Sequence, residues 1–155
     1  MIVIPKSKLE WTAMAAFINF HAKVSPSPDM QFFGYVRGEK LCMVVALDGF
    51  LGKTAQINVA NAPDWHFTPR VMLREVFRYA FVTAGREMLL GVLNSRNTRA
   101  MNYDLHLGFR ELLRLPGLHE DGGDFVVLGL KKSDCRYIDA MEVPSGQEIR
   151  SAARA

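Results

Sequence analysis

The stretch TPRVMLREVFRYAFVTAGREMLLGVL (residues 68–93) places a helix and a strand in direct succession. Thr68-Pro69 is typical of a helix start, because a hydroxyl can cap the first turn and proline suits the first helical position. The helical pattern stops at Gly85, and Met88 to Leu93 is an apolar run that predicts a strand covered on both faces. The helix is predicted to bury Met72, Leu73, Val76, Phe77 and Ala80 and to expose Arg70, Arg74 and Arg78 as a stripe.

Three strand-like segments precede this helix. FFGYVR (32–37) and LCMVVAL (41–47) are separated by Gly38-Glu39, and AQINVA (55–60) follows a turn at Asp48-Gly49. Such short connections favour an antiparallel meander. The third segment, the helix and the apolar strand after it then predict a crossover in which the two strands are parallel and the connection is right-handed.

The segments before and after these strands and this helix complete the fold prediction. Residues 2–4 suit a short edge strand, and a helix is predicted from Ser7, its N-cap, to about His21. Its apolar residues at helical spacing are Leu9, Ala13, Phe17 and Phe20. After the crossover comes a second helix, about residues 97–107, and then FRELLRL and FVVLGL, which flank a turn-rich loop as a terminal hairpin does. The sequence therefore predicts an α+β fold with a mixed central sheet.

Size and composition limit the possible classes. The 155 residues suffice for one buried core and are too few for two ordinary domains, so residues 1–143 are predicted to form a single domain. Residues 144–155 lack periodicity and are predicted to be a flexible tail. No apolar run approaches the ~18 residues of a membrane span, and the N-terminus does not have the order of a signal peptide. Cys42 and Cys135 are too few for a disulfide framework, which favours a cytoplasmic setting.

The charge of the chain is mildly basic, with a net charge of +3 and a pI near 9.0. This balance is compatible with a phosphorylated ligand. A nucleic-acid binder that uses the arginine stripe would need an aromatic platform or a groove helix, which the sequence lacks. A nucleic-acid partner is therefore not expected.

The segment NSRNTRAMNYDLHLGFRE (residues 94–111) follows the apolar strand. Asn97 can cap a helix, Ala100 leaves room for the close approach of another group, and Gly108 permits a left-handed turn before Phe109 enters the core. The segment and the order of elements resemble the GCN5-related N-acetyltransferases, in which an asparagine after an aliphatic strand precedes a small residue by three positions and Gly-Phe by eleven. The resemblance spans roughly residues 8–130 and implies a small, divergent member of the family, of a general look that also occurs among tailed phages.

The resemblance implies acetyl-coenzyme A as a co-substrate. In this family the pantetheine arm lies between the two parallel strands, and the pyrophosphate sits on the N-terminus of the following helix, where free N–H groups favour anions. The chain departs from the family in this loop, because APDWHFTPRVM (residues 62–72) has no glycine where most members carry a glycine-rich run. The implied contacts are Val59, Ala60 and Asn61 for the arm, Arg70, Val71 and Met72 for the phosphates, and Asn97 and Arg99 for the thioester and adenosine ends.

Acetyl transfer to an amine needs a group that takes a proton from the ammonium and a group that protonates the leaving thiolate. The family commonly places the acid as a tyrosine four residues before Gly-Phe. That position is Asp104 here, and Tyr103 precedes it by one residue, a rotation of about 100° on a helix. Asp104 would need a raised pKa to donate a proton at neutral pH. Both are catalytic candidates. For the base, the first parallel strand offers only Gln56 and Asn58, and the histidines in range are His66, His106 and His119.

The expected partner is an amine-bearing small molecule or protein. Residues 120–124, EDGGD, lie in the hairpin loop, where their carboxylates would attract an amine or simply shape the turn. His119, Glu120 and Asp121 are sequence neighbours, which rarely converge on one ion, so no metal is expected. A homodimer is compatible with the pattern. The alternative to an enzyme is a catalytically silent domain of the same fold that binds partners or assembles, which the missing glycine loop and the displaced tyrosine favour.

Overall fold

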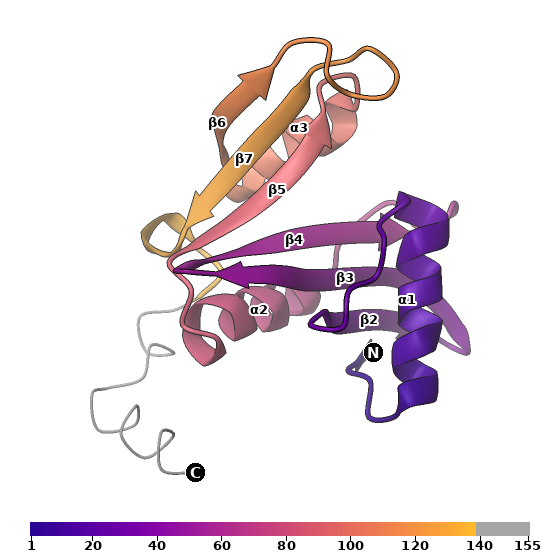
Figure 1. Cartoon of the computed structure of the whole chain (residues 1–155). Coiled ribbons are helices and arrows are strands. Elements are labelled where there is room, and N and C mark those ends of the chain that lie inside the picture. Colours follow the sequence, from indigo (N-terminus) through magenta and orange to yellow (C-terminus); the bar gives the residue numbers. More distant parts are fainter. Residues whose placement is uncertain (139–155) are drawn as a thin grey trace, which may run out of the picture.

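The computed structural model describes residues 1–138, which form one seven-stranded sheet with helices on both faces (Figure 1). The strand order is β1-β2-β3-β4-β5-β7-β6. This mixed sheet confirms the predicted α+β class and the order of meander, crossover and hairpin. The predicted tail, residues 144–155, lies outside the described residues.

The elements are β1 (Ile2–Val3), α1 (Lys8–Ala22), β2 (Gln31–Arg37), β3 (Lys40–Leu51), β4 (Thr54–Asn61), α2 (Arg70–Arg78), η1 (Tyr79–Thr83), β5 (Met88–Asn94), α3 (Thr98–Leu107), β6 (Arg110–Leu115), β7 (Phe125–Lys131) and η2 (Lys132–Asp134).

Strands β1 to β4 pair antiparallel in sequence order, β4 pairs parallel with β5, and β7 lies between β5 and β6. The turn predicted at Asp48-Gly49 is wrong, because β3 continues to Leu51 and the chain turns at Gly52-Lys53. Gly49 has a φ of +55°, and the register shifts between Asp48 and Leu51. An Asp-Gly pair therefore forms an irregularity inside a strand here, which a positive φ permits as readily as a turn.

Helix α1 begins after Ser7 as predicted, and the Ser7 side chain accepts a hydrogen bond from the Glu10 amide. The apolar residues noted at helical spacing are mostly not the ones that pack on the sheet. Leu9 and Phe20 are each 81% exposed, Ala13 is exposed and Phe17 is half-buried. The residues that pack on the sheet are Met14, Ala15 and Ile18. Both faces of α1 carry apolar residues at helical spacing, so periodicity alone does not select the face that meets the sheet.

Helix α2 begins one residue later than predicted. Pro69 is the N-cap and makes no side-chain capping bond, so Thr68 does not cap the helix. The predicted buried face is confirmed for Met72, Val76, Phe77 and Ala80, with Leu73 half-buried. The helix continues as a π-helical turn, η1, and the chain leaves it at Gly85, whose φ of +64° is left-handed.

Helix α3 has the predicted limits and both predicted caps. The Asn97 side chain accepts a hydrogen bond from the Ala100 amide at 3.2 Å, and Gly108 closes the helix with a φ of +110°. Phe109 is buried. The strand before this helix differs from its prediction, because one face of β5 is only partly covered: Met88 and Leu90 are half-buried and Val92 is 44% exposed. No helix among residues 1–138 has both the length and the apolar character needed to cross a bilayer.

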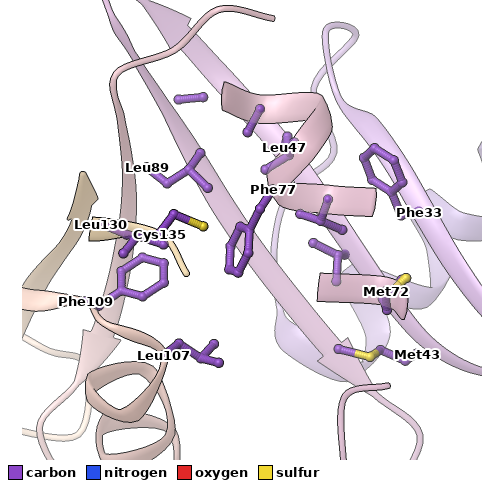
Figure 2. Packing of buried hydrophobic residues seen from close by; sticks show 14 of the residues in the cluster. Phe33, Met43, Leu47, Met72, Phe77, Leu89, Leu107, Phe109, Leu130 and Cys135 are labelled. Carbon is purple, nitrogen blue, oxygen red and sulfur yellow. The ribbon is translucent and has the colours of Figure 1, made fainter. Parts of the chain in front are cut away.

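The hydrophobic core is divided between the two faces of the sheet. The larger cluster lies between the sheet and α2 and includes Phe33, Leu47, Phe77 and Leu89 (Figure 2). The smaller cluster lies under α1 and includes Ile18, Phe32, Val44 and Ala60. Strand residues alternate between the two clusters as the pleat requires. The two faces are called the α2 side and the α1 side below.

The parallel pair β4–β5 is short. Pairing covers Thr54–Met88, Ala55–Leu89 and Gln56–Leu90 and then stops. Beyond this point β4 runs on to Asn61 and β5 to Asn94, and the two strands diverge into a V (Figure 1). Residues 57–61 therefore have a sheet partner in β3 and none in β5. The opening between the strands positions the candidate site.

Candidate active site

A cavity of about 690 Å³ occupies the opening between β4 and β5 and extends to both faces of the sheet. We call it the slot. Its α2 side is lined by Met72 and Phe77 of α2 and by residues of α3. Its α1 side reaches residues 21–24 at the end of α1. The volume is within the range of about 300–1,000 Å³ that is usual for small-molecule sites.

A glycine lies at the floor of the slot. Gly91 lies where the strands part, and a Cβ built on it would meet Ile57 Cγ2 at 3.9 Å. Val59 and Asn61 continue the β4 wall, and Ala100 of α3 also lines the slot. The edge of β4 that has no partner here offers backbone groups to an extended ligand, as an open sheet edge does. The shape suits a slender chain that enters between two strands.

The residues predicted to contact coenzyme A separate into two sets. Val59, Asn61, Met72, Asn97 and Arg99 line the slot. Three others do not line it: Ala60 is buried in the cluster under α1, and Arg70 and Val71 are exposed at the start of α2.

The loop before α2 is held by aromatic packing in place of a glycine cradle. Trp65 packs on Phe67 with ring centroids 4.3 Å apart and on Tyr35 at 5.4 Å. Arg99 of α3 donates from Nη2 to the His66 carbonyl at 3.0 Å, which connects this loop to the start of α3 across the entrance of the slot. The guanidinium therefore lies at the entrance, where it can meet an anion.

The N-terminus of α2 has two backbone amides without a partner in the described part of the chain and one that is used. The Met72 amide donates to the Pro69 carbonyl at 2.9 Å, so it is already used. Within residues 1–138 the amides of Arg70 and Val71 have no hydrogen-bond partner. These two N–H groups and the positive end of the helix dipole remain for an anion.

Tyr103 and Asp104 both line the slot, although they are neighbours on α3. Burial raises the pKa of Asp104 to about 6. Burial also raises the pKa of Tyr103, while a hydrogen bond with Thr68 opposes the rise. A tyrosine with a raised pKa stays protonated at neutral pH, and a carboxyl with a pKa about 6 exchanges protons close to neutral pH. Tyr103 is 37% exposed and Asp104 less so.

Two of the three candidate histidines line the slot. These are His66 and His119, whereas His106 is exposed on α3 away from it. The Asn94 side chain accepts from the Arg96 amide at 3.1 Å through Oδ1, which leaves its Nδ2 to face His119 Nδ1 at 3.3 Å. In its neutral form His119 therefore accepts at Nδ1 and carries its proton on Nε2. In this tautomer Nε2 is a hydrogen-bond donor on a residue that lines the slot, and the hypothesis of a base at this position stays a prediction.

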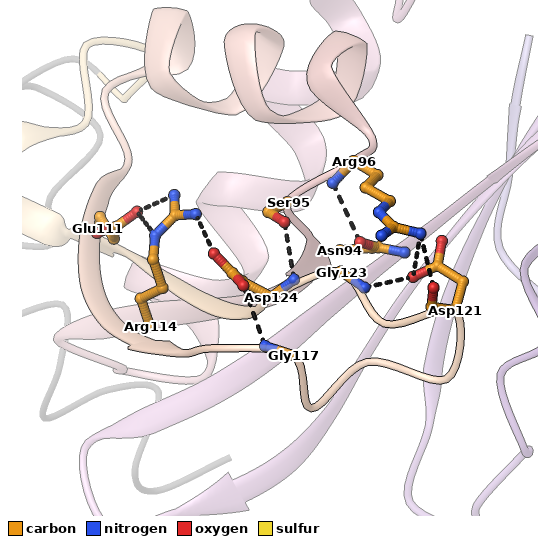
Figure 3. Close-up of polar contacts among 9 residues, drawn as sticks. All are labelled: Asn94, Ser95, Arg96, Glu111, Arg114, Gly117, Asp121, Gly123 and Asp124. Atoms are coloured by element: carbon orange, nitrogen blue, oxygen red, sulfur yellow. Dashed lines mark hydrogen bonds and ion pairs between the residues drawn. The ribbon is translucent and has the colours of Figure 1, made fainter.

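The carboxylates of the hairpin loop hold the loop itself (Figure 3). Asp121 accepts from the Gly123 amide at 2.9 Å, and its backbone carbonyl accepts from Arg96 Nη1 at 2.6 Å. Asp124 accepts from Arg114 at 2.9 Å and from the Gly117 amide at 3.1 Å. Two of the three acidic groups of residues 120–124 thus shape the turn, which was the simpler of the two interpretations. Within residues 1–138, no three His, Cys, Asp or Glu side chains gather as metal ligands would.

Sequence reasoning missed several residues of the slot. His21 and Lys23 come from the C-terminus of α1, which no local pattern connects with β5. Gly91 and Asn94 were visible as a glycine inside an apolar strand and a polar residue at its end. A glycine in a strand interior often marks the close approach of another group, which was the available signal.

The arrangement brings together a narrow channel, anion-binding groups at one entrance and two proton-exchanging side chains inside. Such a site can hold a long ligand with phosphates at its outer end and a reactive group at its inner end. A second ligand can reach the reactive group from the α1 side, because the slot is open on both faces.

Comparisons with known proteins agree with this description of the fold. Neither a protein-family model nor a curated protein matches the sequence. Among solved structures, spermidine N-acetyltransferase from Vibrio cholerae in complex with CoA and spermine aligns with a TM-score of 0.67 and 12% identity over 89% of this chain and 98% of that one.

Two further structures match at similar levels. The ribosomal-protein-S18-alanine N-acetyltransferase from Escherichia coli has a TM-score of 0.66 and 17% identity over 84% of this chain and 94% of its own. A putative phosphinothricin N-acetyltransferase has the same TM-score and identity, with 84% and 98% covered. At these identities the likeness concerns the fold, and it confirms the resemblance found in the sequence. The chain has the fold of the GCN5-related N-acetyltransferases, the GNAT fold.

Proposed function

We propose that this protein is an acetyl-CoA-dependent N-acetyltransferase that acetylates a primary amine. The observation that carries the proposal is the slot between β4 and β5, which ends at Gly91 and passes the side chains of Tyr103 and Asp104. Structures of the same fold come from enzymes that acetylate amines such as spermidine, and one of them contains CoA. The free edge of β4 beyond Gln56 supports the proposal, because a pantetheine arm can pair with an open strand edge.

Acetyl-CoA is a substrate in this proposal and supplies the acetyl group as a thioester. The amine nitrogen forms a bond to the thioester carbonyl carbon, the C–S bond breaks, the nitrogen loses a proton and the sulfur gains one. Tyr103 is the proposed proton donor, because it lines the slot and its hydroxyl is protonated at neutral pH. Asp104 is the second proton-transfer group, and with a pKa about 6 it is mostly ionised at neutral pH and able to accept a proton.

The proposed binding mode uses the residues that line the slot. Val59 and Asn61 border the arm, and Asn97 and Arg99 lie at the end of α3 nearest the entrance. The free amides of Arg70 and Val71, together with the Arg70 side chain, are proposed to meet the phosphates at the start of α2. The reaction as proposed needs no metal ion. We further propose a cytoplasmic setting, with which the free cysteines Cys42 and Cys135 agree, and a homodimer.

The test is a binding measurement followed by a turnover measurement. Acetyl-CoA at millimolar concentration should raise the melting temperature, because a ligand that binds only the folded state stabilises it. Acetylation of amine pools should then release free CoA, which a thiol reagent detects. Tyr103→Phe should lower turnover and leave CoA affinity unchanged. If the melting temperature does not move at millimolar acetyl-CoA, the proposal fails.

A catalytically silent binding domain is the second candidate. Two observations favour it: the loop before α2 has no glycine, and β4 presents Gln56 and Asn58 where related folds often place a carboxylate base. The two candidates differ in one result. A silent domain would bind acetyl-CoA or a partner protein without releasing CoA in the presence of any amine.

A further inference from the structure

The α1 side of the slot, through which the second substrate would enter, is distinguished by the charge and the hydrogen-bonding groups of its side chains. β4 alternates, so Asn58 faces the same side as Ala60, which is buried under α1. β5 alternates likewise, and Leu89 belongs to the α2-side core, so Asn94 faces the α1 side. The residues of the slot on this side are His21, Ala22, Lys23, Val24, Asn58, Val92, Asn94 and His119. We call this set the α1-side mouth.

The α1-side mouth contains hydrogen-bond donors and a cation and no carboxylate. Lys23 brings a full positive charge on a flexible stem. His119 presents its Nε2 proton, because Asn94 occupies Nδ1. The one Asp or Glu that lines the slot within residues 1–138 is Asp104, which lies on α3.

The nearest carboxylates on this side are already engaged. Asp48 lies behind Asn58 and accepts from its Nδ2 at 3.0 Å, and burial raises the pKa of Asp48, which disfavours its charge. Asp121 lies 4.0 Å from His119 Nδ1, but it also accepts from the Gly123 amide at 2.9 Å, and Arg96 Nη1 at 3.9 Å balances its charge. The C-terminus of α1 adds a partial negative charge near His21, which the Lys23 ammonium outweighs.

A polyamine would fit this mouth badly. Each ammonium that leaves water needs an acceptor or an anion, and none is supplied here by a side chain with a free charge. A carboxylate would find the opposite: an ammonium and an imidazole N–H that have no hydrogen-bond partner among residues 1–138. Charge-assisted bonds of this type are about twice as strong as hydrogen bonds between neutral groups.

We propose that the acceptor is a small amine that also carries a carboxylate, and that Lys23 and His119 bind this carboxylate on the α1 side of the slot. The inference rests on the proposed acetyltransferase function and narrows its substrate. The amine is then directed toward the interior of the slot, where Tyr103 and Asp104 lie. An amino acid has this chemistry.

The experiment compares two pools with the full chain, after CoA binding has been measured by calorimetry. One pool contains amino acids, and the other contains polyamines and the amines obtained by decarboxylating the same amino acids. CoA release should be at least tenfold faster with the first pool. For the best substrate, the matched primary amide should lose tenfold to a hundredfold in kcat/KM, as expected for about one or two lost charge-assisted bonds.

Substitutions test whether the preference for a carboxylate substrate arises in the α1-side mouth. Lys23→Gln should raise the KM of the carboxylate substrate at least tenfold and leave the KM of acetyl-CoA within twofold. Lys53→Gln, at the opposite end of β4, is the matched control and should change neither. His119→Ala should raise the same KM, and His119→Gln should restore part of the loss, because its amide N–H can replace the imidazole donor.

The outcomes separate the two proposals. If CoA does not bind, the proposed function fails and the inference fails with it. If CoA binds and polyamines or decarboxylated amines react as fast as the amino acids, the inference alone is overturned. Absence of any turnover in the amino-acid pool overturns it as well, whatever the second pool does.

Discussion

Ile57 and Gly91 face each other at the point where β4 and β5 separate. They follow the last paired residues, Gln56 and Leu90, and a Cβ on Gly91 would lie 3.9 Å from Ile57 Cγ2. That is an ordinary van der Waals contact, so a methyl group fits here and a larger side chain would extend into the slot. The size of the side chain at position 91 therefore limits how deep a ligand can enter the slot. A substitution there leaves the β4–β5 pairs in place.

Gly91→Ile should block the slot and leave the fold intact. A β-branched side chain suits a strand and has open space in front of it, so the melting temperature should stay within a few degrees of the original. CoA affinity measured by calorimetry should fall at least tenfold. Gly91→Ala is the matched control and should bind within about threefold of the original protein. An isoleucine variant that binds CoA normally would show that the arm does not lie between the strands.

Asp104→Asn should stabilise the protein at pH 7.5 and not at pH 4. The pKa of Asp104 is raised from 3.8 to about 6 by burial, so the folded state holds a proton that the unfolded state loses between these values. Folding therefore carries a cost above pH 6 that disappears as the pH falls toward 4. With allowance for partial exposure the cost is about 2 kcal/mol.

Urea unfolding at the two pH values measures this effect. Asp64→Asn is a control of the opposite sign, because hydrogen bonding with Lys40 lowers the pKa of Asp64. Its removal should not stabilise the protein at pH 7.5. Equal stability of Asp104→Asn and the original protein at pH 7.5 would mean that water solvates this carboxyl in the folded state.

Arg99→Ala should weaken the binding of CoA more than the binding of pantetheine. Its guanidinium lies at the entrance of the slot and donates to the His66 carbonyl at 3.0 Å, so it can meet a phosphate and also holds the loop. The expected loss for CoA is about tenfold, as for one charge-assisted bond. Arg70→Ala separates the two candidate arginines. Equal losses for CoA and pantetheine in either variant would exclude phosphate contact by that side chain.

Asn97 combines a structural bond with a proposed contact, and two substitutions separate them. Asn97→Ala removes the cap of α3, in which the Ala100 amide donates to Asn97 Oδ1, and should cost about 1 kcal/mol of stability. Asn97→Ser keeps a capping oxygen and most of the stability. If Asn97 also contacts the thioester, the serine variant should be stable and still lose affinity for acetyl-CoA. Unchanged affinity in the serine variant would limit Asn97 to capping.

The face by which α1 meets the sheet can be tested by two alanine substitutions. Ile18 is fully buried, and Ile18→Ala should cost about 2–4 kcal/mol in the free energy of unfolding. Phe20 is 81% exposed, and Phe20→Ala should change it by less than about 0.5 kcal/mol. Chemical denaturation of both variants checks the pair. A large loss for Phe20→Ala would indicate that its face is covered in solution.

The order and type of the elements were predictable because local signals are strong where they decide topology. Gly38-Glu39, the apolar strand at Met88 and the caps at Asn97 and Gly108 each act within a few residues. The predictions that failed depend on contacts distant in sequence. Packing on the sheet buries Ile18 and leaves Phe20 exposed, and no local sequence pattern predicts which of the two is buried.

The candidate site was predictable in part for the same reason. Tyr103, Asp104, Asn97 and Arg99 lie on one helix whose start and end the sequence defines, and all four line the slot. Residues from the far side of the sheet were not found, because the packing of α1 on β4 brings them there. The raised pKa of Asp104 is likewise a product of tertiary burial.

In residues 1–138 the two halves of the sheet are joined by three rungs of strand pairing, from Thr54–Met88 to Gln56–Leu90, and by the Glu87 and Met88 amides, which donate to the Lys53 carbonyl. A small rotation about these rungs would change the width of the opening while each half kept its own strand pairing. The same seam should be the place where amide protons exchange with solvent sooner than in the β2–β3 centre, and where a bound ligand slows that exchange most. Such a rotation would let the two halves of the sheet close on an inserted molecule about one hinge.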